Sequence, residues 1–323
     1  MISRRALLAT GAAFGTGIAA RAAEPAYPNR SIKMIVPFAP GGPVDVIARM
    51  TAHHITTHLG QQVIIENRPG AGATLAYKAV AAAEPDGYTL LYASSGSLGI
   101  APALYPNLDL EPLKAFDPIA TTALLPHMMV AGPSLPVSTV AEFVAYAKAH
   151  PGQLNYGASL GTPPHLLATL FTVKAGLNVT YIPYKGSAPA VTDLLGGRTQ
   201  FSIDGMLILA PLAKQGKVRP LAVARAERWP DMPNVPTLVE SGFPDFVIDA
   251  WVGVVAPRGT PADILATLNA AINAGAQSEE TRLTLTRFHA LPKTGTPTDF
   301  AALIRKELPL WANMVKLAGA AGG

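Results

Sequence analysis

One stretch near the start of the chain combines a strand, a glycine-rich loop and a helix in a way that suits anion binding. Residues 32–36 are a short apolar run, and the loop 37–43 contains two glycines and three prolines, which cannot continue a strand. Apolar residues then recur at helical spacing, with Pro43 suited to the first helical position and Gly60 to the position past the end. Backbone N–H groups at a helix start carry partial positive charge, so this loop predicts a site for an anionic group.

A second stretch could do different chemistry. Residues 157–161 read Gly-Ala-Ser-Leu-Gly, the G-x-S-x-G pattern that places a nucleophilic serine between a strand and a helix. His289 with Asp204 or Asp249 could complete a triad for acyl transfer, so the alternative function is an exported serine esterase of the α/β-hydrolase type using Ser159. The pattern is short, however, and an HGGG-type oxyanion loop is missing from the sequence. Fluorophosphonate labelling of Ser159 distinguishes an esterase from a binding loop.

The other polar candidates have simpler structural interpretations. His53, His54 and His58 could be read as a metal site, but no further ligand stands near them in sequence, so we expect a solvated helix face. His165 follows the 157–161 loop, and we expect it to make a structural hydrogen bond rather than a ligand contact. Lys185 could attract an anion or point to solvent, and the sequence does not decide between these roles.

Alternating strand and helix patterns must position these loops. The alternation runs over residues 31–125 and recurs over 150–225, which predicts two α/β domains with mainly parallel sheets covered on both faces. Ligands of such sheets bind outside the carboxyl ends of the strands, where both runs carry glycine- and serine-rich loops. We therefore expect two lobes that face each other across a cleft. Residues 102–118 are punctuated by prolines and predict irregular structure, whereas 119–131 predicts a strand.

The first 22 residues predict export. They have a basic start, a mildly apolar middle and the small-x-small sequence Ala20-Arg21-Ala22, with cleavage expected after Ala22. Ser3-Arg4-Arg5 resembles a twin-arginine signal, and an ordinary secretory signal is the alternative. Either route places the mature chain in the periplasm. The apolar part is too short and too rich in glycine and alanine for a membrane span.

Charge and composition exclude several functional classes. The chain has 25 Lys and Arg and 21 Asp and Glu, and removal of the three signal arginines leaves 22 basic residues in the mature protein. This near balance gives no case for nucleic-acid binding. The absence of cysteine excludes disulfides, thiolate zinc sites and cysteine nucleophiles. We expect no cofactor and no metal ion.

Seven strings spread over the mature chain carry a family resemblance. They are IVPFAPGGPVDVIAR at 35–49, VIIENRPGAG at 63–72, DGYTLLYASSGS at 86–97, SLGTPPHL at 159–166, YIPYKGSAPAVTDLLGG at 181–197, VRPLAV at 218–223 and WVGVVAPRGTP at 251–261. With them the sequence resembles the Bug-type family of periplasmic solute receptors for tripartite tricarboxylate transporters. The resemblance covers essentially the whole mature chain.

The resemblance implies a two-domain periplasmic binding protein of the Venus-flytrap type, with an interdomain cleft and no catalysis. Domain 1 would comprise residues 23–129 and 252–323, and domain 2 residues 130–251, with crossings near 127–133 and 249–254. It implies capture of a small carboxylate by a monomer that serves the membrane subunits of a tripartite transporter. The ligand-binding positions that it implies are Phe38, Ala39, Gly41, Gly42, Ser94, Ser95, Gly96, Ser97, Ser159, Gly161, Thr162, Gly186, Ser187 and Asp204.

Three departures from the family pattern narrow the expected ligand. The family often has a histidine and an asparagine where this chain has Leu98 and Ala101, and a glycine-asparagine pair where it has Ser159-Leu160. These positions are less polar here, which argues against a highly charged ligand such as citrate. We expect an organic or aromatic acid with one bound carboxylate and an apolar body.

Overall fold

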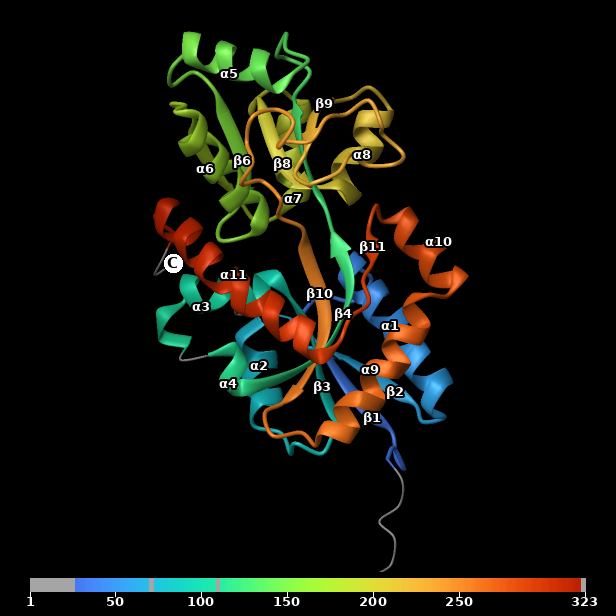
Figure 1. Cartoon of the computed structure of the whole chain (residues 1–323). Coiled ribbons are helices and arrows are strands. Elements are labelled where there is room, and N and C mark those ends of the chain that lie inside the picture. Colours follow the sequence, from blue (N-terminus) through green and yellow to red (C-terminus); the bar gives the residue numbers. More distant parts are fainter. Residues whose placement is uncertain (1–26, 70–72, 109–110, 321–323) are drawn as a thin grey trace, which may run out of the picture.

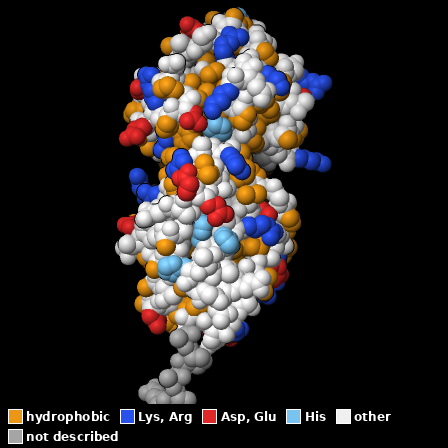
Figure 2. Space-filling model, turned by 90° about the vertical axis from the view of Figure 1, so that its right-hand side faces the viewer, with side chains coloured by type: hydrophobic (Ala, Val, Ile, Leu, Met, Phe, Trp, Pro, Cys, Tyr) orange, Lys and Arg blue, Asp and Glu red, His pale blue; other side chains and the backbone are white. Residues whose placement is uncertain are grey.

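Two lobes make up the molecule, each built on one β-sheet and covered by helices (Figure 1). The computed structural model describes residues 27–69, 73–108 and 111–320, so the expected export signal lies outside the described residues. The face shown in Figure 2 narrows between the lobes and carries interspersed acidic and basic side chains. Within the described residues no helix is both long and apolar enough to cross a membrane.

The first sheet has six strands in the order β11-β4-β10-β3-β1-β2. β1 pairs in parallel with β2 and β3, whereas β10 runs antiparallel to β3 and β4. Its two faces are packed by separate apolar cores, which is why β1 is almost continuously apolar. The strands are β1 (Ile32–Val36), β2 (Val63–Asn67), β3 (Thr89–Ser94), β4 (Phe116–Leu125), β10 (Ala250–Pro257) and β11 (Leu291–Pro292).

The second sheet has five strands in the order β7-β6-β8-β5-β9. β6 pairs in parallel with β7 and β8, and β5 runs antiparallel to β8 and β9. Its core contains the aromatic cluster of Phe143, Phe171 and Phe201. The strands are β5 (His127–Ala131), β6 (Asn155–Ser159), β7 (Thr180–Tyr184), β8 (Phe201–Gly205) and β9 (Arg219–Val223).

Helices connect the strands, and their ends carry recognisable stop and start signals. α1 begins at Pro43 and ends before Gly60, whose φ of 73° is the left-handed conformation that glycine adopts without strain. α5 begins after Thr139, whose side chain accepts a hydrogen bond from the Glu142 N–H. The longer helices are α1 (Pro43–Leu59), α2 (Thr74–Ala81), α5 (Val140–Ala149), α6 (Pro163–Ala175), α7 (Ser187–Leu195), α8 (Met206–Lys214), α9 (Ala262–Ala276), α10 (Glu279–Arg287) and α11 (Pro297–Leu317).

The chain changes sheets twice, and this makes both sheets mixed. The expected α/β fold of two lobes is present, but the expectation of mainly parallel sheets is wrong. β4 leaves the first sheet at Pro126 and continues as β5 in the second, and β10 returns from the second lobe antiparallel to β4. A strand that enters a sheet from the other lobe runs opposite to the strands that lead toward that lobe, so it pairs with them antiparallel. α11 packs on β4 and on α6, so it touches both lobes.

Two expected elements differ in the structure. Residues 102–118 are not irregular throughout: they include part of α3 (Ala101–Leu104), the 3₁₀ helix η3 (Pro106–Leu108), α4 (Pro112–Ala115) and the start of β4. Prolines occupy early positions of α3 and α4, where their missing N–H costs nothing. The expected strand 119–131 is two strands, because Pro126 interrupts it. Residues 95–100 form a π-helix, η2 (Ser95–Ile100), that runs directly into α3.

Candidate ligand-binding site

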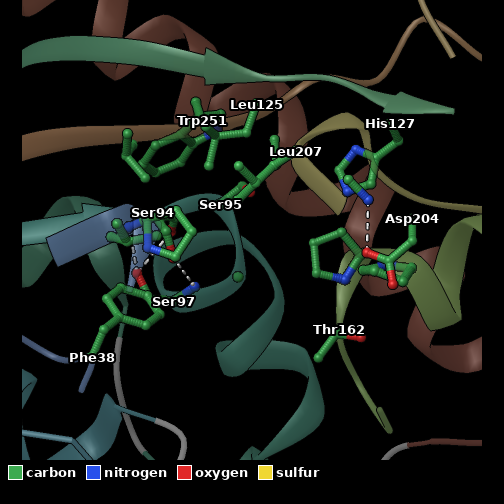
Figure 3. A pocket seen from close by; sticks show the side chains of 18 of the residues that line it. Phe38, Ser94, Ser95, Ser97, Leu125, His127, Thr162, Asp204, Leu207 and Trp251 are labelled. Atoms are coloured by element: carbon green, nitrogen blue, oxygen red, sulfur yellow. Dashed lines mark hydrogen bonds between the residues drawn. The ribbon is translucent and has the colours of Figure 1, made fainter. Parts of the chain in front are cut away.

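A cavity of about 540 Å³ lies between the two lobes. Figure 3 shows Phe38, Ser94 and Ser97 on one side of it and Thr162, His127 and Asp204 on the other. Most of the wall is apolar, and no Lys or Arg is among the described residues that line it. Its apolar side chains include Phe38, Val44, Leu104, Leu125, Leu160, Met206, Leu207, Ile208, Trp251 and Phe288.

The segment from Ser94 to Ser97 presents open hydrogen-bond donors to the cavity. Ser94 and Ser97 form a reciprocal cap: the Ser94 N–H donates to Ser97 Oγ at 2.7 Å and the Ser97 N–H to Ser94 Oγ at 3.3 Å. Ser97 Oγ also donates to the Ser94 carbonyl oxygen at 2.7 Å, so both capping side chains are engaged. The N–H groups of Ser95 and Gly96 have no acceptor within the helix, because they occupy its first two positions. Ser95 Oγ has no hydrogen-bond partner in the described part of the chain.

The glycine loop before α1 is filled by a carboxylate of the chain itself. Asp45 Oδ2 accepts hydrogen bonds from the Gly41 N–H at 2.9 Å and Arg49 Nε at 2.8 Å, and Oδ1 accepts one from Asn67 Nδ2 at 2.7 Å. Burial alone would raise the pKa of the Asp45 carboxyl, but the bonds from Arg49, Asn67 and Gly41 outweigh it and lower the pKa. The sequence predicted an anionic group at this loop, and in the structure the Asp45 carboxylate supplies it. An acidic residue in the first helical turn could have indicated this.

The loop before α6 has few donors left for a ligand. Thr162 Oγ1 donates to the Ser159 carbonyl oxygen at 2.7 Å, and the Thr162 N–H bonds the same oxygen at 3.2 Å. Pro163 and Pro164 follow, and proline has no N–H. The expected structural role of His165 is confirmed: its Nδ1 accepts the Gly161 N–H at 3.2 Å, and the ring packs on Tyr181.

At the start of α8 two N–H groups are already bonded within the protein, one of them to a side chain. Asp204, only 4% exposed, accepts the Gly205 N–H at 2.7 Å, and the Ser187 hydroxyl also bonds its carboxyl group. Burial raises the pKa of the Asp204 carboxyl, and the hydrogen bonds from Ser187 and Gly205 oppose that shift. The Met206 N–H donates to the Pro126 carbonyl oxygen at 2.9 Å.

The structure brings only part of the expected residue set to the cavity. Lys185 is exposed and lies outside the wall. The expected residues on the wall are Phe38, Ser94, Ser95, Gly96, Ser97, Gly161, Thr162 and Asp204. Those off the wall are Ala39, Gly41, Gly42, Ser159, Gly186 and Ser187, of which Ser187 reaches the site through Asp204.

Three further wall residues were not expected as ligand contacts. His127 begins β5, His289 follows α10 and Trp251 lies on β10. His127 and Trp251 lie in the crossings expected near 127–133 and 249–254, although they were not expected to contact a ligand. His289 lies outside both crossings. Trp251 Nε1 donates to Glu307 Oε2 on α11 at 2.7 Å, which fixes one edge of the ring.

The residues of the proposed triad are not assembled in this structure. Ser159 contributes its carbonyl oxygen to the Thr162 turn, and its side chain is not on the cavity wall. No hydrogen bond joins Ser159 to His289 in the described part of the chain. Asp249 pairs with Arg225 at 3.3 Å rather than with a histidine.

The histidines of α1 also show no metal site. His54 Nε2 lies 2.8 Å from Thr281 Oγ1 and the ring is half-buried against α9 and α10, whereas His53 and His58 are exposed. The expected solvated face is therefore correct for two of the three. In the described residues no group of three or more potential metal ligands is clustered.

Comparison with known proteins agrees with this architecture. The Bug protein BugT of Bordetella pertussis (strain Tohama I) is 38% identical over 306 residues, which are 94% of each chain. The solved structure of Rpa4515 from R. palustris with adipate is similar with a TM-score of 0.79 at 36% identity, over 91% of this chain and 98% of that one. The structure of the periplasmic binding protein BugD gives 0.76 at 34% identity, over 91% and 99%.

These similarities establish the fold as that of the two-domain periplasmic binding proteins. The model of the tripartite tricarboxylate transporter family receptor matches residues 47–319, which includes most of both lobes. The chain therefore belongs to the tripartite tricarboxylate transporter receptor family, as a receptor of the Bug type.

Proposed function

We propose that this chain is a periplasmic receptor that captures a small monocarboxylate in the cavity between its lobes. The observation that carries the proposal is the state of the helix N-termini around the cavity. Before α1 the Gly41 N–H is taken by Asp45, and α6 begins with two prolines. At α8 the Gly205 and Met206 N–H groups go to Asp204 and to the Pro126 carbonyl oxygen. The N-terminus at Ser95 keeps open N–H groups and a free hydroxyl. An anionic group therefore finds donors at one end of the cavity.

Uncharged donors are sufficient for this role. Hydrogen bonds to a charged group contribute about 1.5–3 kcal/mol each, and a helix N-terminus adds about 0.3–2 kcal/mol. Two or three such bonds from Ser95 and Gly96 supply much of the roughly 8 kcal/mol of a micromolar complex, offset by the cost of association. The apolar wall then contributes about 25 cal/mol for each Å² of apolar ligand surface that it buries.

The cavity disfavours a second carboxylate on the same ligand. Asp204 is the acidic residue of the described wall, and no Lys or Arg there could neutralise a further negative charge. An unpaired charge in a buried site is costly. The related structure of Rpa4515 contains adipate, a dicarboxylate. The less polar Leu160 and Ala101 on this wall support a different preference in this chain.

Capture would involve closure of the lobes. The cavity wall combines residues of both sheets, so a bound ligand contacts both lobes only when they are close together. A ligand shifts an equilibrium between open and closed forms by its differential affinity for them. The closed form would present the ligand to the membrane subunits of a tripartite transporter. The receptor would act as a monomer, after export from the cytoplasm.

A thermal-shift screen of the mature chain against a panel of carboxylates tests this function. A ligand at 100 times its Kd should add about 2.7 kcal/mol to the free energy of unfolding. Stabilisation by monocarboxylates with apolar bodies supports the proposal. A panel in which citrate and other highly charged acids stabilise best would contradict it.

A further inference from the structure

Two buried histidines at the cavity wall have unused hydrogen-bonding capacity. His127 is 4% exposed and His289 is 8% exposed, and both line the cavity. In each ring Nδ1 is fully buried and has no hydrogen-bond partner in the described part of the chain. Nε2 is therefore the nitrogen left to meet a ligand. Neither residue is used by the carboxylate site at Ser95.

The two histidines come from different lobes, and both line the same cavity as Asp204. His127 begins β5 and pairs with Gly205 of β8, and Figure 3 shows its ring and the Asp204 carboxyl group on the same side of the cavity. His289 lies in the connection from α10 to β11, and its ring centroid is 6.2 Å from that of Trp229. His289 has a φ of 47° because it follows the C-cap of α10, where its N–H bonds the Thr286 carbonyl oxygen and the Ala290 N–H bonds that of Leu285.

Burial determines the protonation of these rings. It lowers the pKa of His127 to about 4 and also lowers that of His289, where Lys214 acts in the same direction and Asp231 against it. Both imidazoles are therefore neutral near pH 7, with one donor and one acceptor each. A buried acceptor without a partner is tolerated better than a buried N–H without one, so the proton belongs on Nε2. The two rings then offer two N–H donors, and Asp204 offers an acceptor.

We infer that His127, His289 and Asp204 form a second subsite, which takes a hydroxyl group at the end of the ligand remote from its carboxylate. This inference rests on the proposed capture of a carboxylate at Ser95. A hydroxyl has two lone pairs and one proton, which match two N–H donors and one carboxylate acceptor. A second carboxylate would face Asp204 without a cation, and an ammonium group has no lone pair for the histidine N–H groups. The ligand class is thus a hydroxy acid with its two polar groups at opposite ends.

A matched series of six-carbon acids tests the subsite by titration calorimetry. Hexanoate, 6-hydroxyhexanoate, adipate and 6-aminohexanoate differ only at the remote end, and benzoate with 4-hydroxybenzoate repeats the comparison on an aromatic body. We expect the hydroxy acid to bind about tenfold more tightly than its parent acid, and more tightly than adipate or the amino acid.

Substitutions separate this subsite from the carboxylate site. His127→Phe and His289→Gly should each lower the ratio of the affinities for the hydroxy acid and its parent acid toward one. Glycine is chosen at His289 because it adopts positive φ without strain. The control His150→Phe, on the outer side of the second lobe against Tyr146, should keep the preference. Persistent binding of the parent acid also shows that each variant is folded.

Each outcome decides the inference. A preference that persists in both cavity variants, or equal binding of parent and hydroxy acids by the unsubstituted protein, overturns the second subsite but leaves carboxylate capture intact. Tightest binding of adipate or of 6-aminohexanoate assigns a different chemistry to this end and also overturns it. If none of these acids binds, the proposed function and the subsite fail together.

Discussion

The indole N–H of Trp251 and the carboxylate of Glu307 join the cavity wall to the last helix through a 2.7 Å hydrogen bond. The same oxygen, Glu307 Oε2, accepts the Trp311 indole N–H at 3.0 Å. Trp311 packs in the apolar core that it shares with residues of the second lobe. One buried carboxylate thus connects a ring that lines the cavity with the helix that touches both lobes.

Removal of this carboxylate should destabilise the fold. Glu307→Ala leaves two buried indole N–H groups without acceptors, at a cost of about 1–3 kcal/mol each. Glu307→Gln keeps an acceptor oxygen and removes a charge that burial disfavours, so it should cost much less. Urea unfolding of both variants measures the difference. Equal losses would mean that the charge, rather than the acceptor, stabilises this contact.

Acidification should destabilise the protein through His127. Burial lowers the pKa of His127 to about 4, below the value of 6.5 that it has when unfolded, so the unfolded state binds more protons between these values. Neutral His127 therefore leaves the folded state at full stability above the unfolded pKa, and the folded state loses stability as the pH falls toward 4. Between about pH 7 and about pH 5 the loss should be about 2 kcal/mol.

The variant His127→Phe isolates this contribution. Its unfolding free energy should fall less on acidification than that of the unsubstituted protein, by about the same 2 kcal/mol. His165, whose pKa burial also lowers to about 4, stays in both proteins and cancels in the comparison. Parallel stability curves for the two proteins would exclude His127 as the source.

The carboxylate site should depend on Ser95 and not on Lys185. Ser95→Ala removes a hydroxyl that has no other partner in the described residues, and should weaken carboxylate binding by about 1–3 kcal/mol. Thr162→Ala should act mainly on stability, because the Thr162 hydroxyl already donates to Ser159. Lys185→Ala should have little effect, since Lys185 is exposed and off the wall. Calorimetry that finds Lys185→Ala the most damaging of the three would reject a site made of uncharged donors.

Closure of the lobes should depend on Gly161. This residue has a φ of 69°, and a side chain there would overlap Leu104 of the opposite lobe. Gly161→Ala should therefore hold the lobes apart and weaken binding. Gly60→Ala is the matched control, because Gly60 has a φ of 73° but nothing within 4 Å of an added Cβ. X-ray scattering with a saturating ligand should show compaction for the control and not for Gly161→Ala. Equal compaction of both variants would show that the approach of Gly161 to Leu104 does not control closure.

Local signals in the sequence were sufficient for many elements. The strand 32–36 and the helix 43–59 were expected with the bounds observed, because proline, glycine and apolar spacing mark them within the segment itself. The return of β10 against β4 was not expected, because pairing between distant strands leaves no local mark. β11 was missed because it contains only two residues.

In the site, too, local sequence signals predicted some residues, whereas contacts between distant segments could not be predicted. The donor segment at Ser94–Ser97 could be expected from its composition and family resemblance, and Asp204 from its place at a strand end. The roles of His127 and His289 could not, because each becomes a wall residue only when the lobes and the segment after α10 come together. Asp45 could have been recognised, since an acidic residue in the first turn competes for the donors of its own loop.

Calorimetric titration with matched carboxylates and amides tests whether the helix start at Ser95 and Gly96 binds a carboxylate. Hexanoate and hexanamide, and benzoate and benzamide, have the same apolar bodies and differ in charge at the end expected to bind Ser95 and Gly96. We expect the carboxylates to bind, each amide to bind at least about tenfold more weakly, and Ser95→Ala to narrow this difference in affinity. Equal affinity for acid and amide, with no change on Ser95→Ala, would show that this cavity does not recognise a carboxylate at that helix start.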